Sequence, residues 1–245
     1  QYPWPRTIGI DEHSFRRTRG RTEFASIIVD FKNRRVFDLV DGKSGPALEM
    51  ALAHIPGREN VESVVLDLCD PFKNFARSFF PNARVVADKF HVLRLIMPAI
   101  IRRRNEITGT RSDWKVRRLL TMSSKRFDHF QRRAIWQYLE QYPDLHEVYF
   151  FKEALHNFYR IKGYNKAADA LTCLTDRMAA SQIPEIQTMR KTLIKWRQEI
   201  LNYFATGLTN GMTEGFNNIA KLVQKRAFGY KSFSNYRLRL LTLWN

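Results

Sequence analysis

Residues 61–67 read V-E-S-V-V-L-D, and this run decides the fold class that the sequence predicts. Its apolar character is typical of a strand in the middle of a sheet. Helical patterns flank it at 46–54 and 71–80, and another strand pattern follows at 83–87. Strands that return through a crossover helix run parallel to one another. We therefore expect an α/β domain whose sheet contains parallel strands.

The residues before this run predict an antiparallel meander. Residues 6–12 (R-T-I-G-I-D-E), 26–31 and 35–40 have strand patterns, and residues 32–34 make a hairpin connection. The predicted order is β-β-β-α-β-α-β. In such a sheet the first and fourth strands lie side by side.

The strand pattern stops near residue 90. Six segments with helical periodicity follow, at 93–104, 114–121, 127–141, 145–161, 165–180 and 185–206. They predict an all-helical insertion at 93–206 that interrupts a core made of residues 1–92 and 207–245.

The composition favours an anionic partner. The chain has 245 residues, 44% of them hydrophobic, and its 41 Lys and Arg against 24 Asp and Glu give a net charge of +17. Such an excess indicates nucleic acid, and basic groups at 102–104, 117–118 and 132–133 favour phosphate contact. No apolar run reaches the ~20 residues of a membrane span. We expect no membrane partner.

Two cysteines far apart in sequence make neither a disulfide framework nor a zinc site. This favours a reducing, intracellular compartment. The chain begins Q-Y-P-W-P-R, which is no signal peptide, and runs almost directly into the first strand. We interpret it as a domain of a longer protein.

Three acids follow predicted strands: Asp11, Asp67 and Asp88. Asp11 and Asp67 become neighbours if the first and fourth strands are adjacent. Two carboxylates that close repel one another unless a cation lies between them, and hard oxygen ligands select Mg²⁺ or Mn²⁺. Two such ions activate a water or hydroxyl and stabilise the leaving oxygen during attack on a phosphodiester.

Residues 208–218 read L-T-N-G-M-T-E-G-F-N-N and place one acid, Glu214, in the first turn of a helix that Asn210 or Thr209 caps. Packed against the edge with Asp11 and Asp67, Glu214 completes a three-carboxylate site. Residues three, four, seven and eleven positions later share its face; these are Asn217, Asn218, Lys221 and Lys225. This row suits a surface that holds a metal ion beside a phosphate backbone, although taken alone it is most simply an exposed polar helix face.

Structural roles compete at several of these positions. Asp88 precedes a predicted helix and is a candidate N-cap, and His91 suits the start of the same helix. Asp67 is also acceptable as a turn residue at a strand end. Asp11 closes an apolar strand on a glycine-lined face and has no obvious structural task.

Together these motifs resemble the Asp-Asp-Glu (DDE) transposases of prokaryotic insertion sequences, and most closely the ISL3 group. The resemblance runs from about residue 7 to residue 241, with the helical block its weakest part. It rests on I-G-I-D-E-H-S (8–14), V-V-L-D-L-C-D-P-F (64–72), F-F-P-N-A-R-V-V-A-D-K-F-H-V (79–92) and T-N-G-M-T-E-G-F-N-N-I-A-K-L-V-Q-K-R-A-F-G-Y-K-S-F (209–233).

The resemblance implies an RNase H-like fold, two divalent ions and DNA strand transfer. Asp11 and Glu214 map onto the first and third catalytic acids. We assign the second to Asp67, with Asp88 and His91 as an accessory pair, and keep Asp88 as the alternative second acid. The zinc module and helix-turn-helix that the family carries at its N-terminus have no counterpart in this sequence.

The predicted function is therefore the catalytic domain of a transposase. It would cleave at transposon ends and join the 3′-hydroxyl to target DNA, with Asp11, Asp67 and Glu214 holding Mg²⁺ or Mn²⁺. The predicted contacts to the DNA backbone are Asn217, Asn218, Lys221, Lys225 and Arg226. We expect a homodimer or a higher assembly on DNA, in the prokaryotic cytoplasm at the nucleoid. Two alternatives are a DNA-binding protein derived from a transposase and a metal nuclease that cuts without joining.

Overall fold

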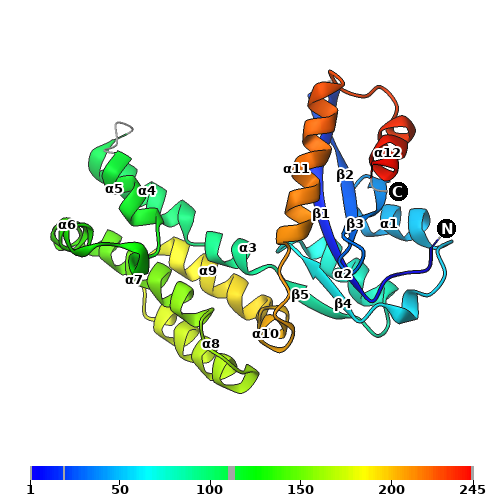
Figure 1. The fold of residues 1–245 in the computed structure, drawn as a ribbon. Coiled ribbons are helices and arrows are strands. Elements are labelled where there is room, and N and C mark those ends of the chain that lie inside the picture. Colours follow the sequence, from blue (N-terminus) through cyan, green and yellow to red (C-terminus); the bar gives the residue numbers. More distant parts are fainter. Residues whose placement is uncertain (1, 19, 110–113, 244–245) are drawn as a thin grey trace. The chain divides into compact units, whose positions relative to one another are not determined.

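The computed structural model describes residues 2–18, 20–109 and 114–243. The chain divides into two compact units (Figure 1), which are described separately. The first unit contains residues 1–88 and 206–245, and the second contains residues 89–205. Every helix in the described part of the chain is too short or too polar to cross a lipid bilayer.

The first unit contains a mixed five-stranded sheet with helices, so the predicted α/β class is confirmed. Its elements are β1 (Thr7–Thr18), β2 (Arg21–Asp30), β3 (Arg35–Asp41), α1 (Gly45–Leu52), a short 3-10 helix (Arg58–Asn60), β4 (Ser63–Leu66), α2 (Asp70–Phe79), β5 (Arg84–Ala87), α11 (Gly211–Arg226) and α12 (Phe233–Thr242).

The strand order in the sheet is β3-β2-β1-β4-β5. β1, β2 and β3 pair antiparallel, whereas β4 pairs parallel with β1 on one side and with β5 on the other. All four residues of β4 are buried, as expected for a central parallel strand covered on both faces.

β1 and β2 are longer than the sequence predicts. β1 continues to Thr18, and β2 already begins at Arg21. The added residues are mostly polar and basic, which hides the strand pattern, but His13 and Phe15 point inward while Ser14 and Arg16 are exposed. Asp11 therefore lies within β1 and not at its end. It is the pairing of β1 with β4 that stops just before it, at Ile10.

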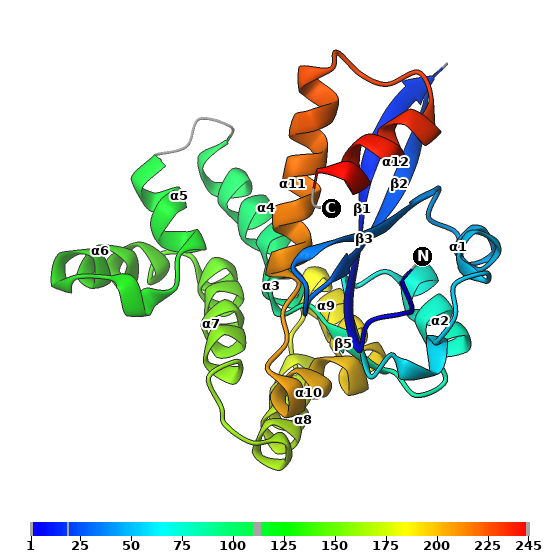
Figure 2. The same cartoon turned by 45° about the vertical axis from the view of Figure 1, so that its right-hand side comes forward.

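α11 and α12 pack against β1, β2 and β3 (Figures 1 and 2). The core between them contains Phe15, Ile27 and Val29 from the strands, Phe216 and Ala220 from α11, and Tyr236 and Leu240 from α12. Elsewhere in the unit, α2 packs against β4 and β5, and α1 packs against α2 and β3. These contacts hold the first turn of α11 beside β1.

The second unit is helical throughout its described residues. Its elements are α3 (Lys89–Arg94), α4 (Met97–Thr108), α5 (Trp114–Thr121), a 3-10 helix (Ser124–Arg126), α6 (His129–Leu139), α7 (Pro143–Phe158), α8 (Tyr164–Ala179), α9 (Pro184–Lys195) and α10 (Arg197–Thr206). The single helix expected at 185–206 is two helices that meet at Trp196, a residue outside helical geometry.

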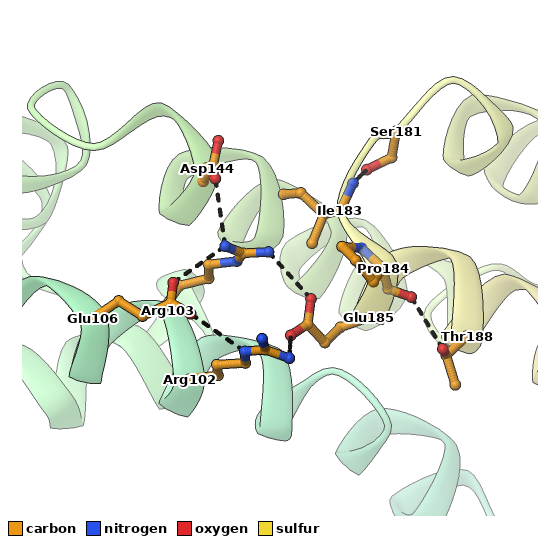
Figure 3. A network of polar contacts seen from close by, with 9 residues as sticks. All are labelled: Arg102, Arg103, Glu106, Asp144, Ser181, Ile183, Pro184, Glu185 and Thr188. Carbon is orange, nitrogen blue, oxygen red and sulfur yellow. Dashed lines mark hydrogen bonds and ion pairs between the residues drawn. The ribbon is translucent and has the colours of Figure 1, made fainter.

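An ion-pair network joins α4, α7 and α9 inside this unit (Figure 3). Glu185 contacts Arg102 at 2.9 Å and Arg103 at 3.3 Å, and Arg103 also contacts Glu106 and Asp144. The next arginine, Arg104, is buried. Phosphate contact by this basic run stays a prediction, and the structure shows that Arg102 and Arg103 pair with acids of the same unit.

Candidate active site

The sheet register places three aspartates at equivalent positions on neighbouring strands. Ile10 of β1 pairs with Leu66 of β4, and Leu66 pairs with Ala87 of β5. The next residue on each strand is Asp11, Asp67 and Asp88. The pairing persists one step beyond β5, since the Asp88 N–H donates to the Leu66 carbonyl at 2.9 Å. Three carboxylates thus follow one line across the sheet.

Asp67, Asp88 and His91 lie close enough together to share a metal ion. Each offers one ligand atom, and these atoms lie within 4.8 Å of one another. His91 belongs to the first turn of α3, three residues after Asp88, so the short local chain connection brings it there. Within the described residues, this is the group of acids and histidines that could share an ion in this way; Asp11 and Glu214 are not members of it.

Asn210 contacts both aspartates of that group. Its side-chain amide donates to Asp67 Oδ1 at 3.1 Å and to the Ile10 carbonyl at 3.4 Å, while its backbone N–H donates to Asp88 Oδ1 at 3.0 Å. Asn210 holds the N-cap position of α11 as predicted, but its side chain reaches the Asp67 carboxylate and makes no capping hydrogen bond. The predicted position of the cap is therefore right, but the predicted side-chain hydrogen bond to the helix is not formed.

Asn217 contacts the remaining aspartate of the line. It is 2% exposed, and its amide donates to Asp11 Oδ2 at 2.6 Å and to the Glu12 carbonyl at 3.0 Å. Asp11 Oδ1 accepts the N–H of Glu12 at 2.7 Å. Asn217, which the sequence predicts as a DNA contact, faces the sheet in this structure and donates to Asp11.

Glu214 lies between the two asparagines on the first turn of α11, and its backbone N–H donates to the Asn210 carbonyl at 2.9 Å. It is exposed, as are Asn218, Lys221, Lys225 and Arg226 further along the helix. Positions three and four apart share a helix side, so Glu214 borders the face that carries Asn210 and Asn217. The helix therefore separates a buried amide face from an exposed, mainly basic face.

α11 approaches β1 closely because residue 9 is glycine. A Cβ at Gly9 would lie 1.9 Å from Thr213 Oγ1 and 2.9 Å from Asn210 Oδ1. Both distances are far below van der Waals contact, so any larger residue would push the start of the helix away from the strand. The glycine-lined face noted in the sequence is thus a docking surface for α11.

Below Asp11, His13 forms a buried polar pair with the last helix. Its Nε2 lies 2.7 Å from the Tyr236 hydroxyl, and both side chains are buried. Burial lowers the pKa of His13 to about 4; an interaction with Asn217 opposes this shift, and the charge of Lys221 adds to it. Burial also raises the pKa of Tyr236. His13 is therefore neutral at pH 7.

Sequence reasoning missed Asn210 as a carboxylate partner and His13 as a core histidine. His13 had a usable signal, since it lies two residues after Asp11 on a strand and so shares its face. Asn210 had none, because an asparagine before a glycine and a helix is most simply a turn or cap residue.

Comparison with known proteins finds a match along almost the whole chain. A family model described as a transposase, of the DDE type of ISL3 elements, matches residues 8–240. The transposase for insertion sequence element IS1001 of Bordetella parapertussis is 22% identical over 228 residues, which are 89% of this chain and 56% of that protein. An ATP-dependent protease of Lactococcus lactis subsp. lactis is 35% identical over 60 residues, which are 24% of this chain and 19% of that protein. The chain thus spans about half the length of the first relative, and less of the second.

Proposed function

The chain belongs to the ISL3-type DDE transposase family, and from this premise we propose that it carries the reaction centre of a DNA transposase. The proposed activity is hydrolysis of a phosphodiester at a transposon end, followed by attack of the freed 3′-hydroxyl on target DNA. The observation that carries the proposal is the line of Asp11, Asp67 and Asp88 across β1, β4 and β5, with the family's third acid, Glu214, on the helix docked beside them.

The proposed fold of residues 1–92 and 207–245 is RNase H-like, with residues 93–206 as a helical insertion between β5 and α11. Three antiparallel strands followed by two parallel strands support it. This arrangement brings the third acid back to the sheet after more than a hundred residues of helix.

The residues present fit a divalent cation. Asp88 is 2% exposed and Asp67 half-buried, and their ligand atoms lie together with that of His91. Carboxylates held together in a buried place need a compensating charge, and oxygen donors with one imidazole suit Mg²⁺ or Mn²⁺. A bound ion of this kind supplies a more acidic water or hydroxyl and stabilises charge on the leaving oxygen.

We assign Asp11, Asp67 and Glu214 as the residues that hold the ions, with Asp88 and His91 as the accessory pair or, for Asp88, the alternative second acid. Asn210 and Asn217 orient the aspartates through their amides. An amide is a suitable partner, because it donates to a carboxylate without adding charge of its own.

DNA is the proposed substrate and partner. Lys221, Lys225 and Arg226 are exposed on the side of α11 that continues from Glu214, with Asn218 beside them. Cations in this position bind backbone phosphates and set the register of a strand without reading its sequence. Joining two transposon ends to one target also favours a homodimer or a larger assembly on DNA.

The test is Mn²⁺-dependent DNA nicking by the wild-type chain and by Asp11→Ala, Asp67→Ala, Asp88→Ala and Glu214→Ala. We expect nicking to fall at least 100-fold in the Asp11, Asp67 and Glu214 variants, because removal of a catalytic group costs this much or more. Asp128→Ala, at the exposed cap of α6, is the matched control and should nick like wild type. Full activity of Asp67→Ala together with loss in Asp88→Ala would move the second acid to Asp88. Full activity of all four variants would contradict the proposal.

A further inference from the structure

Asn210 is the point at which three strands and a helix are tied together. Its side chain donates to the carbonyl of Ile10, where the β1–β4 pairing ends, and to Asp67, the residue after β4. Its backbone N–H donates to Asp88, the residue after β5. Its own carbonyl accepts the N–H of Glu214 at 2.9 Å. The carboxylates of Asp67 and Asp88 thus accept hydrogen bonds from this asparagine, whereas Glu214 is joined to it only through the helix backbone.

We propose that Asn210 is a positioning residue that holds Asp67 and Asp88 in place for a divalent cation. This inference rests on the proposed function. Two neighbouring carboxylates, one of them buried, repel and turn apart unless donors or a cation fix them. Asn210 supplies one N–H to each. The same residue begins α11, so the acids on the strands and Glu214 on the helix share one anchor.

Helix capping does not account for the asparagine. Serine occupies an N-cap as well as asparagine does, but its side chain is too short to replace the amide that reaches Asp67. The buried Asn210 Oδ1 also lacks a hydrogen-bond partner among the described residues. A buried acceptor without a partner is unfavourable. The benefit of an asparagine here therefore comes from the two hydrogen bonds that its amide donates, to Asp67 and to the Ile10 carbonyl.

The close approach to β1 supports the same role. A Cβ on residue 9 would overlap Thr213 Oγ1 at 1.9 Å and crowd Asn210 Oδ1 at 2.9 Å, and glycine avoids both contacts. The strand, the glycine and the asparagine therefore fix the distance between the sheet and the first turn of α11. Loss of the amide should loosen Asp67, while the backbone N–H still donates to Asp88 and the helix itself remains.

The experiment measures the Mn²⁺ dissociation constant by isothermal titration calorimetry for wild type, Asn210→Ser, Asp67→Ala and the control Asn202→Ser, each with its metal-free melting temperature. Asn202 is a buried asparagine of α10 that accepts a hydrogen bond from Gln198 and belongs to the other unit. We expect Asn210→Ser to bind Mn²⁺ at least about tenfold more weakly than wild type, as for other residues that orient metal ligands. Asn202→Ser should bind like wild type whatever its melting temperature.

A folded Asn210→Ser that binds within twofold of wild type would overturn the inference. If instead Asp67→Ala binds Mn²⁺ as tightly as wild type, the proposed ion site itself is wrong, so the two failures are distinct. Asn210→Thr is the second variant, for the case that serine prevents folding. It keeps a hydroxyl that can cap the helix but removes the amide that donates to Asp67, so it should bind Mn²⁺ at least about tenfold more weakly than wild type. Binding within twofold of wild type would also overturn the inference.

Discussion

Gly9 sets how near the helix with Glu214 comes to the strand with Asp11. Its place could be filled by any strand former on grounds of sheet propensity, but the atoms of Thr213, Asn210 and Phe31 already occupy the space of a side chain. A small change at this residue therefore acts on the whole candidate site.

Gly9→Ala should destabilise the chain by about 1–3 kcal/mol, because the new Cβ overlaps packed atoms, and should reduce nicking by displacing α11. Gly215→Ala is the matched control. It lies in α11 with open space around the position of its Cβ, so alanine should stabilise the chain by about 0.5–1 kcal/mol. Urea unfolding measures both. Equal stability of Gly9→Ala and wild type would mean that the close approach of α11 is not as described.

His13 makes the free energy of unfolding depend on pH. Its pKa is about 4 in the folded chain, where burial disfavours the charged form, against an ordinary value of 6.5. Between these values the unfolded chain binds a proton that the folded chain does not, so stability is full above pH 6.5 and falls as the pH drops towards 4. The loss at pH 4 amounts to about 3 kcal/mol.

His13→Gln removes this proton linkage. The difference in unfolding free energy between wild type and variant should therefore shrink by about 3 kcal/mol from pH 7 to pH 4. Urea titrations at each pH measure it, with His129→Gln, an exposed histidine of α6, as control. The groups facing His13 are Tyr236, Asn217 and Lys221. Parallel pH profiles of wild type and His13→Gln would contradict the assignment.

At the scale of elements, α11 has a buried face that packs on the sheet and an exposed face that carries charged residues. Asn210, Thr213 and Asn217 face the sheet and are buried, whereas Glu214, Lys221 and Lys225 are exposed. The sequence could predict the helix and the basic residues, but not which amide turns inward. Asn217 and Asn218 are adjacent and chemically identical. Only the rotation of the helix on the sheet, set by Phe216 and Ala220 in the core, decides which one meets Asp11.

The exposed face should bind DNA through its charges. Lys221→Ala combined with Lys225→Ala should lower DNA affinity and reduce the slope of log K against log salt concentration by about two, roughly one for each lost phosphate contact. Lys32→Ala with Arg84→Ala removes the same charge at the other end of the parallel strands, where Arg84 pairs with Ser63. Fluorescence anisotropy at several salt concentrations compares the pairs. An equal change of slope in both would mean that α11 has no special part.

The helical unit depends on Glu185, which contacts Arg102 and Arg103 from a different helix (Figure 3). Burial alone would raise the pKa of Glu185, but its hydrogen bonds and the two arginines lower it below the ordinary value. Glu185→Ala leaves two like charges together and should cost about 1–3 kcal/mol. Glu140→Ala, at an exposed helix end, should cost little. Chemical denaturation measures both, and an equal cost would contradict a structural role for the network.

At the scale of the whole molecule, the sequence predicted the sheet and helices far better than the contacts of the site. The run at 61–67 and its flanking helices require parallel strands, and the composition pointed to DNA. What it could not predict concerned tertiary context. The basic residues in the outer halves of β1 and β2 hide the strand pattern there. Arg102 and Arg103 form ion pairs with acids from distant segments. The side chain of Asn210 donates to Asp67 and does not cap its own helix. No local pattern holds this information.

The charge of the molecule fits the same account. A net charge of +17 on 245 residues raises the local concentration of DNA near every surface, so binding alone does not test the proposed chemistry. The central claim is that the acids on the sheet edge and α11 catalyse strand transfer.

The most direct test is a strand-transfer assay with a pre-cleaved 3′-hydroxyl transposon end, target DNA and Mn²⁺, comparing wild type with Asp67→Asn and Glu214→Gln. These variants keep the size of each side chain and remove its charge. The account predicts joined products with wild type and at least a 100-fold loss with each variant, while DNA binding persists. Nicked but never joined DNA with wild type, or joining that survives both substitutions, would contradict it.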